Sequence, residues 1–247
     1  MTTHDTTAST SRVKGRFRLP ETPQREPDEV TQYDQLFRKG LSAALAIHLG
    51  NPETTLVEAD RWVVPDTRFN RSRGRYPDLL VAFGVDPALY KANNGYVVSE
   101  QGKPPDFVLE VASESTAEID VGDKRRDYEA LGIREYWRFD HTPTGEFHGA
   151  RLAGERLADG LYVALEIEEL PDGSLQGYSP ALGLNLRWEQ GELVFYNPAT
   201  GKPIATLETE REARITAEVE RNSEREARAA AEARVRELEE RLRQQAS

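Results

Sequence analysis

Two short apolar segments, each holding one acidic residue, constrain the fold of this chain more than any other feature. Successive side chains of a strand point to opposite faces of a sheet. In residues 76–83 (YPDLLVAF) this alternation places Asp78 on an apolar face, and in residues 106–112 (DFVLEVA) it does the same for Glu110. A carboxylate in such a place must be paired, hydrogen-bonded, protonated or bound to a cation. The sequence therefore predicts a sheet with an acidic site built into it.

The pattern around these two strands predicts one α+β domain over residues 29–200. Residues 1–28 are polar and rich in Thr, Arg and Pro, so we expect a disordered leader. Apolar residues at helical spacing predict a first helix over residues 29–49. The other expected elements, in chain order, are strands over 54–64 and 76–83, a polar loop around 93–95, strands over 96–99 and 106–112, a helix over 120–131, a strand over 135–140, and antiparallel strands between 149 and 196. This order is typical of helices packed on a sheet.

Residues 205–247 have a different composition, with 11 Glu, 9 Arg and neither Gly nor Pro. High helix propensity predicts one long charged helix. Val235, Leu238 and Leu242 follow the spacing of a coiled-coil seam, whereas the upstream seam positions carry charges. A short coiled coil that joins copies of the chain and a helix that stays alone in water are both compatible with this pattern.

Composition excludes several classes of protein. No cysteine is present, which excludes disulfides, thiolate zinc sites and cysteine nucleophiles. No Gly-x-Gly element precedes a helix, which disfavours dehydrogenases and nucleotide-driven motors. No segment approaches the roughly 20 apolar residues of a membrane span, and the N-terminus lacks the apolar core of a signal peptide. We therefore expect a soluble, cytoplasmic protein that does not contact a membrane.

The helix expected over 120–131 adds a lysine to the two carboxylates. Lys124 lies in one stripe with Val121, Tyr128 and Leu131, which predicts that this stripe faces the sheet. An ammonium there could compensate the charge of the carboxylates, orient a water, or stabilise charge that builds on a phosphate. Two carboxylates on neighbouring strands form the hard-oxygen site that Mg²⁺ or Mn²⁺ prefers.

Each of these residues also has a purely structural interpretation. Asp78 follows Pro77 and could cap a turn. Glu110 and Lys124 could form an ion pair with no further role. Lys124 could bury only its stem and extend its ammonium to solvent. Spacing alone does not decide between these interpretations and a metal site.

Three longer motifs carry a resemblance to a known family. They are RGRYPDLLVAFGVDP, PPDFVLEVASEST and the spaced DxGDKRRDYEALGIREYWRFD. Over roughly residues 26–200 the chain resembles the Uma-two family of bacterial endonucleases, which belongs to the PD-(D/E)XK nuclease superfamily. The resemblance implies a restriction-endonuclease-like core with the order α-β-β-β-α-β, extended here by further antiparallel strands. That order agrees with the one read from the pattern.

The resemblance also implies roles for single residues. Asp78 matches the acid of the PD element, and Glu110 matches the acid of the (D/E)XK element. The superfamily places a lysine at residue 112, where this chain has Ala112. In the Uma-two family a lysine on the following helix takes over this role, and Lys124 stands at the matching position.

The resemblance implies two further residues. Glu29 matches an additional acidic position near the start of the first helix, and the backbone carbonyl of Val111 is expected on the metal. The implied function is a Mg²⁺- or Mn²⁺-dependent endonuclease that hydrolyses phosphodiester bonds, with DNA as the expected substrate. The chain could also form a homo-oligomer through its core or its C-terminal helix.

A different class of function stays open: a nuclease-fold protein that binds nucleic acid or acts as a scaffold without turnover. Ala112 favours it, as does the net charge of the chain, −11 overall and −9 over residues 1–204, which hold 23 basic and 32 acidic residues. A nuclease needs phosphate affinity, normally from a basic groove. Candidates for that groove, which could equally be solvated surface charges, are Arg68, Arg71, Arg73, Arg75, Arg125 and Arg126.

Overall fold

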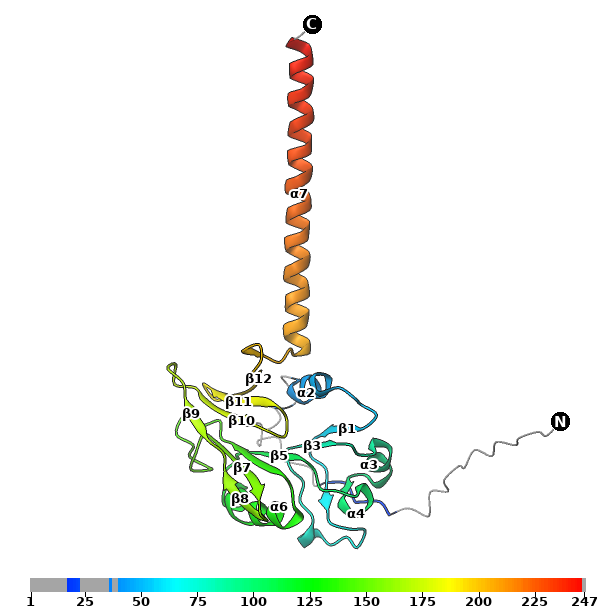
Figure 1. Ribbon diagram of the computed structural model, residues 1–247, viewed down its shortest axis with the longest axis vertical. Coiled ribbons are helices and arrows are strands. Elements are labelled where there is room, and N and C mark those ends of the chain that lie inside the picture. The colour runs from blue at the N-terminus through cyan, green and yellow to red at the C-terminus, as the bar shows by residue number, and fades with distance from the viewer. Residues whose placement is uncertain (1–16, 23–35, 37–39, 246–247) are drawn as a thin grey trace, which may run out of the picture. The chain divides into compact units, whose positions relative to one another are not determined.

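The computed structural model describes residues 17–22, 36 and 40–245 (Figure 1). The chain divides into two compact units, residues 1–204 and residues 205–247, and each is described by itself. The first unit holds all three sheets of the described residues and the candidate site.

A six-stranded mixed sheet forms the centre of the first unit. Its strands lie in the order β1-β3-β5-β6-β7-β8, and β5 and β6 are parallel whereas the other neighbours are antiparallel. The strands are β1 (Thr55–Glu58), β3 (Leu79–Phe83), β5 (Phe107–Val111), β6 (Glu135–Phe139), β7 (Leu152–Ala158) and β8 (Leu161–Ala164). A parallel pair needs a crossover connection, and helix α6 (Arg125–Leu131) supplies it. With α2 (Leu41–Leu49) before β1, the order α-β-β-β-α-β is confirmed.

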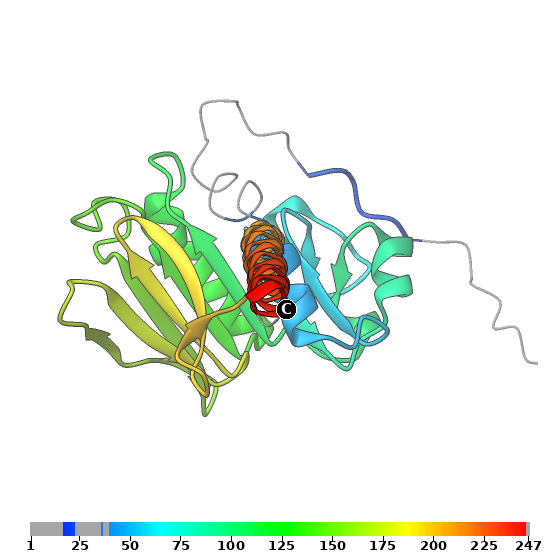
Figure 2. The same cartoon turned by 90° about the horizontal axis from the view of Figure 1, so that it is seen from above.

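The antiparallel strands expected between 149 and 196 are divided between two sheets: β7 and β8 belong to the first sheet, and a second, antiparallel sheet follows it in the chain. Its order is β13-β12-β11-β10-β9, so its strands form a meander. They are β9 (Ile167–Glu169), β10 (Leu175–Ser179), β11 (Leu184–Glu189), β12 (Glu192–Asn197) and β13 (Lys202–Pro203). Figure 2 shows these strands, drawn in yellow tones, on one half of the unit. The other half holds a short parallel pair of β2 (Val63–Val64) and β4 (Tyr96–Val97).

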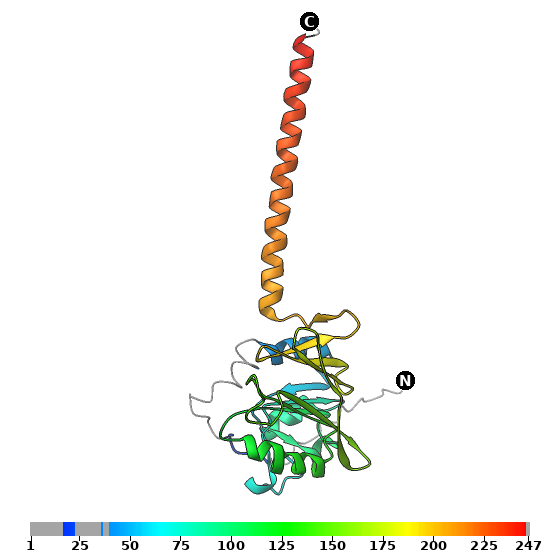
Figure 3. The same cartoon turned by 90° about the vertical axis from the view of Figure 1, so that its left-hand side faces the viewer.

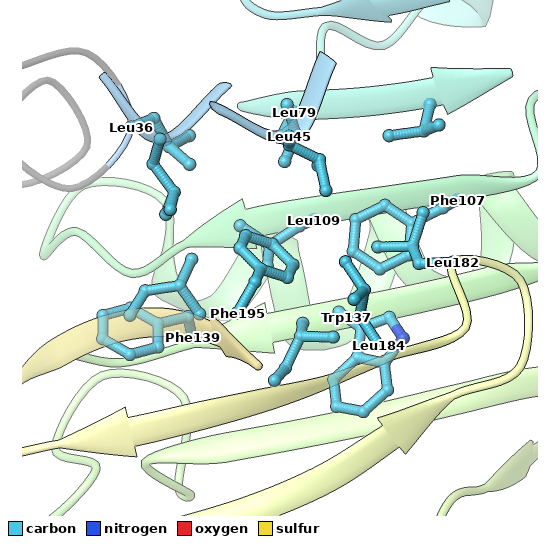
Figure 4. Packing of buried hydrophobic residues seen from close by; sticks show 14 of the residues in the cluster. Leu36, Leu45, Leu79, Phe107, Leu109, Trp137, Phe139, Leu182, Leu184 and Phe195 are labelled. Atoms are coloured by element: carbon cyan, nitrogen blue, oxygen red, sulfur yellow. The ribbon is translucent and has the colours of Figure 1, made fainter. Parts of the chain in front are cut away.

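Both faces of the six-stranded sheet are covered. One face packs against α2 and the second sheet around Phe107, Leu109 and Trp137 (Figure 4). The other face packs against α6, and Val108 of β5 and Tyr128 of α6 belong to one buried hydrophobic cluster there. Figure 3 shows α2, in blue, and α6, in green, on opposite sides of the sheet. Alternation along β5 therefore directs Glu110, like Val108, toward α6.

The N-terminal expectations need correction. Of the helix expected over residues 29–49, the structure describes α2 over Leu41–Leu49, preceded by Gly40 with a left-handed backbone (φ of 63°), whereas residues 29–35 and 37–39 lie outside the described residues. Residues 17–22 of the expected disordered leader are ordered: Leu19 is buried, and its amide donates to the carbonyl of Asn93. The other residues of the leader, and Glu29 with them, lie outside the described residues.

Two short helices replace segments for which the sequence predicted a loop or a strand. Helix α3 (Pro87–Asn93) begins where the Asp86 carboxylate accepts hydrogen bonds from two backbone amides, with Pro87 in the first turn. Helix α4 (Val98–Gln101) takes half of the strand expected over 96–99. Both are too short to show a helical period in the sequence. The strand expected over 54–64 is likewise two strands, β1 and β2.

Helix α7 (Leu207–Gln245) makes up the second unit and matches the long charged helix expected there. Every α7 side chain that the structure describes is exposed. The coiled coil stays a prediction. Among the helices described, none has both the length and the apolar character that crossing a bilayer requires.

Candidate active site

Asp78 lies directly before β3 and is 1 % exposed. In the antiparallel pair of β3 and β5, Leu79 stands opposite Leu109, so the next step of this register places Asp78 opposite Glu110. The backbone amide of Val111 donates to Oδ2 of Asp78 over 2.6 Å. Asp78 therefore bonds to the neighbouring strand beside Glu110, which goes beyond the turn-capping interpretation.

Glu110 is fully buried, and both of its carboxylate oxygens accept hydrogen bonds from the helical segment on the sheet. Nζ of Lys124 donates to Oε2 over 2.8 Å. The hydroxyl of Tyr128 donates to Oε1 over 2.6 Å. These partners on both oxygens fix the orientation of a carboxylate that has no contact with solvent.

The helical segment turns Lys124 inward through a local departure from α-helical geometry. Residues Asp120–Lys124 form a π-helical turn, η3, between the single turn α5 (Ala117–Ile119) and α6. The wider turn shifts the inward stripe, so that Asp120 and Lys124 are buried whereas Val121 is 40 % exposed. The prediction that Val121 faces the sheet is wrong for this reason. The prediction for Lys124 holds, and the side chain is only 10 % exposed, so the interpretation with its ammonium in solvent is wrong.

Sequence reasoning missed two members of this cluster. Asp120 is fully buried; its Oδ1 lies 2.7 Å from Nζ of Lys124, and its Oδ2 lies 3.1 Å from Nε2 of His148. The four-residue spacing of Asp120 and Lys124 is a signal that could have indicated their pairing. His148 comes from the loop between β6 and β7, and no local pattern connects it to the helix.

The charges of the cluster do not balance. Asp78, Glu110 and Asp120 contribute three carboxylates, and Lys124 is the ammonium that contacts two of them. Burial raises the pKa of Glu110 to about 8; Lys124 opposes this shift, whereas Asp78 and Asp120 add to it. Glu110 is therefore the group that takes up a proton when no further cation is present.

Lys124 and Asp120 keep their charges. Burial alone would lower the pKa of Lys124, but the charges of Glu110 and Asp120 outweigh it and raise that pKa above its usual value. Burial alone would raise the pKa of Asp120, but the hydrogen bond with His148 and the charge of Lys124 outweigh it and lower that pKa. The buried site therefore holds an ion pair of Lys124 and Asp120 beside the carboxyl group of Glu110, whose pKa of about 8 is close to neutral pH.

The donors present suit a hard divalent cation with few protein ligands. Within the described ranges, no group of three or more His, Cys, Asp or Glu side chains is arranged as a complete metal cage. Mg²⁺ is commonly bound by one or two carboxylates, with waters and substrate phosphates as the remaining ligands. Asp78 and Glu110 provide two carboxylates on adjacent strands, and the surplus of negative charge favours a cation there.

The arginines expected to form a basic groove are largely paired with acidic side chains. Arg68 and Arg73 both contact Asp66. Arg75, which precedes β3, pairs with Asp127 of α6. On the helical segment itself, Arg125 pairs with Glu155 and Arg126 with Asp123, whereas Arg71 lies exposed in the short turn Arg71–Arg73.

Comparison with known proteins identifies the family of the chain. A search of curated proteins found no match. Among solved structures, the chain is similar to a protein described as a putative nuclease belonging to DUF820 from Anabaena variabilis, with 10 % sequence identity and a TM-score of 0.37 over 61 % of this chain and 75 % of that one. Residues 40–189, more than half of the chain, match the model of the family Uma2, described as Putative restriction endonuclease. These residues include Asp78, Glu110, Val111 and Lys124, and on this match the chain belongs to the Uma2 family.

Proposed function

We propose that this chain is a metal-dependent endonuclease that hydrolyses phosphodiester bonds in DNA. The observation that carries the proposal is the convergence of Asp78, Glu110 and Lys124 in one buried cluster with a surplus of negative charge. The family supports nuclease chemistry in general. The metal and the DNA substrate are part of the proposal.

In the proposed site, the carboxylates of Asp78 and Glu110 and the backbone carbonyl of Val111 would hold Mg²⁺ or Mn²⁺. A bound divalent cation polarises a phosphate and lowers the pKa of a bound water. Val111 and Tyr128 donate hydrogen bonds that orient the two carboxylates. Because Lys124 keeps its charge, its ammonium can neutralise charge that builds on the phosphate.

The proposed access to the cluster is from the side of Lys124, because its side chain is the most exposed of the three. Arg71 and Arg126 are exposed on segments close in sequence to Asp78 and Lys124 and are the proposed phosphate contacts. Glu29 stays a candidate on the resemblance alone.

Cleavage assays on the purified full chain test the proposal. With Mg²⁺ or Mn²⁺ the protein should nick DNA, and EDTA should abolish nicking. Asp78→Asn, Glu110→Gln and Lys124→Ala should each lower the rate by at least about 100-fold, as expected for groups that act together at a reacting centre. The matched controls Glu118→Gln and Lys91→Ala, both at exposed positions, should leave the rate within twofold. A rate that survives all three site substitutions would refute the mechanism.

A second candidate function is a nuclease-fold protein that binds nucleic acid without turnover. Ala112, fully buried where the superfamily has its lysine, favours this candidate, as does the pairing of most nearby arginines with acidic residues. Calorimetry with Mn²⁺ separates the two candidates, because a site that depends on Glu110 is expected only for the enzyme.

Self-association of the chain, through its core or through α7, is a further part of the proposal. Ile215, Val219 and Val235 are exposed apolar residues of α7. Light scattering on the full chain and on a variant ending at Ile204 tests the role of α7. A mass that falls only by the weight of the removed segment would exclude association through this helix.

A further inference from the structure

The ammonium of Lys124 has two anchors, and only one of them belongs to the proposed metal ligands. Nζ lies 2.8 Å from Oε2 of Glu110 and 2.7 Å from Oδ1 of Asp120. A lysine side chain is long and flexible, so holding its ammonium at one point requires a fixed partner. Glu110 cannot be the only partner if its oxygens also serve a cation. Asp120 is therefore the anchor that remains.

Asp120 is itself held by partners of its Oδ2 atom and of its backbone carbonyl. Oδ2 accepts a hydrogen bond from the hydroxyl of Thr116 over 2.8 Å and lies 3.1 Å from Nε2 of His148. Its backbone carbonyl accepts from the hydroxyl of Tyr136 over 2.8 Å. With no exposed surface, Asp120 has no route to contact nucleic acid.

His148 is fixed in turn by the loop that carries it. The carboxylate of Asp140 accepts hydrogen bonds from the backbone amides of Phe147 and His148 over 2.7 and 2.9 Å. The carbonyl of Asp140 accepts from Nε1 of Trp188 in β11 over 2.7 Å. This loop therefore links the second sheet to Asp120. A carboxylate only accepts hydrogen bonds, so the ring nitrogen of His148 that faces Asp120 is the donor.

We infer that Asp120, held in place by His148, is a positioning residue that keeps the ammonium of Lys124 in the site. The expected effect of Asp120 on cleavage rests on the proposed function, whereas its expected effect on the position of Lys124 does not. Asp120 and His148 are proposed to contact neither the substrate nor the metal ion. Their effect on the rate passes through Lys124.

A double-mutant cycle on the full chain tests this route. Asp120→Asn should lower kcat about 10- to 100-fold, the usual effect of removing a residue that orients an active-site group, and should change KM for DNA less than threefold. In the Lys124→Ala background, Asp120→Asn should cause less than a twofold further loss. Glu118→Gln, at an exposed position of the preceding turn, is the matched control and should change kcat less than twofold. An equal loss in both backgrounds would show a general structural role and overturn the inference.

A second readout does not require cleavage. In spectra of the metal-free protein labelled with ¹⁵N-lysine, the Lys124 ammonium signal is assigned by its absence in Lys124→Ala. Asp120→Asn should shift this signal and speed exchange of its protons with water, and His148→Gln should do the same to a smaller degree. An unchanged signal would overturn the inference. If the wild-type chain shows no cleavage but the signal shifts, the proposed function fails and the positioning role stands.

Folding of the variants is checked by urea unfolding. Where Asp120→Asn does not fold, His148→Gln, which leaves the carboxylate in place, enters the same cycle. The expected result is then a loss of kcat below 10-fold that disappears in the Lys124→Ala background. A loss that persists there would overturn the inference as before.

Discussion

Replacing Glu110 by glutamine should remove a large pH dependence from the free energy of unfolding of the metal-free protein. Burial, with Asp78 and Asp120, raises the pKa of Glu110 from 4.5 to about 8 in the folded state. Between these values the folded chain holds a proton that the unfolded chain has released. The stability contributed by the protonated carboxyl is therefore fully present below pH 4.5 and is lost as the pH rises toward 8. Each pH unit in this window costs about 1.4 kcal/mol, so the step from about pH 5.5 to pH 7.5 costs about 3 kcal/mol. Glutamine is uncharged at every pH and has no such cost.

Urea unfolding in EDTA at several pH values, followed by tryptophan fluorescence, measures this difference. Other titrating groups are common to the wild type and the variant, so the gap between the two curves isolates Glu110. Glu118→Gln removes an exposed carboxylate and should give a curve parallel to that of the wild type. If the Glu110→Gln curve also stays parallel to the wild type within about 0.5 kcal/mol, the burial argument for Glu110 is refuted.

Three further predictions concern stability and are checked by urea or thermal unfolding. Tyr128→Phe removes the hydroxyl that donates to Glu110 and should cost about 1–3 kcal/mol, because a buried acceptor loses its partner; no change would mean that the hydroxyl is not needed there. Gly154→Ala should destabilise by about 1–3 kcal/mol, since its Cβ would lie 2.8 Å from the ring of Trp137; an unchanged melting temperature would contradict this close packing. Asp140→Asn should cost about 1–3 kcal/mol at neutral pH, because two amides and the Thr142 hydroxyl and amide bond to its carboxylate. These hydrogen bonds outweigh burial and lower the pKa of Asp140. The difference in unfolding free energy between wild type and Asp140→Asn should therefore persist above pH 3.8 and vanish as the pH falls below the folded-state pKa. A difference that grows in acid would contradict this.

Local periodicity determined the main sheet. Strands β3 and β5 follow from the alternation in YPDLLVAF and DFVLEVA, and the same alternation placed Asp78 and Glu110 on the face that α6 covers. The end of the helix expected over 120–131 also agrees with the structure, in which Gly132 follows α6 with φ of 77°, a conformation that glycine adopts without strain. These features depend on neighbours a few residues away in the chain, which is why a single sequence suffices for them.

The residues that make up the site could be predicted from the sequence only in part. Lys124 was expected to face the sheet from a regular helical stripe, whereas the structure brings it there through a π-helical turn that also buries Asp120 and exposes Val121. A regular period of 3.6 residues cannot anticipate such a turn. The short helix α3 was missed for a related reason, since seven residues are too few to show a period.

The sequence by itself determined the carboxylates, the lysine and the order of the strands, because residue type and spacing along one element are local properties. Only the tertiary structure decided how the charge of Lys124 is shared. His148 is 28 residues from Asp120 along the chain, and it reaches the site because the loop after β6 is tied to the second sheet through Trp188. Contacts between such distant segments depend on how whole layers pack, and no spacing within one segment encodes them.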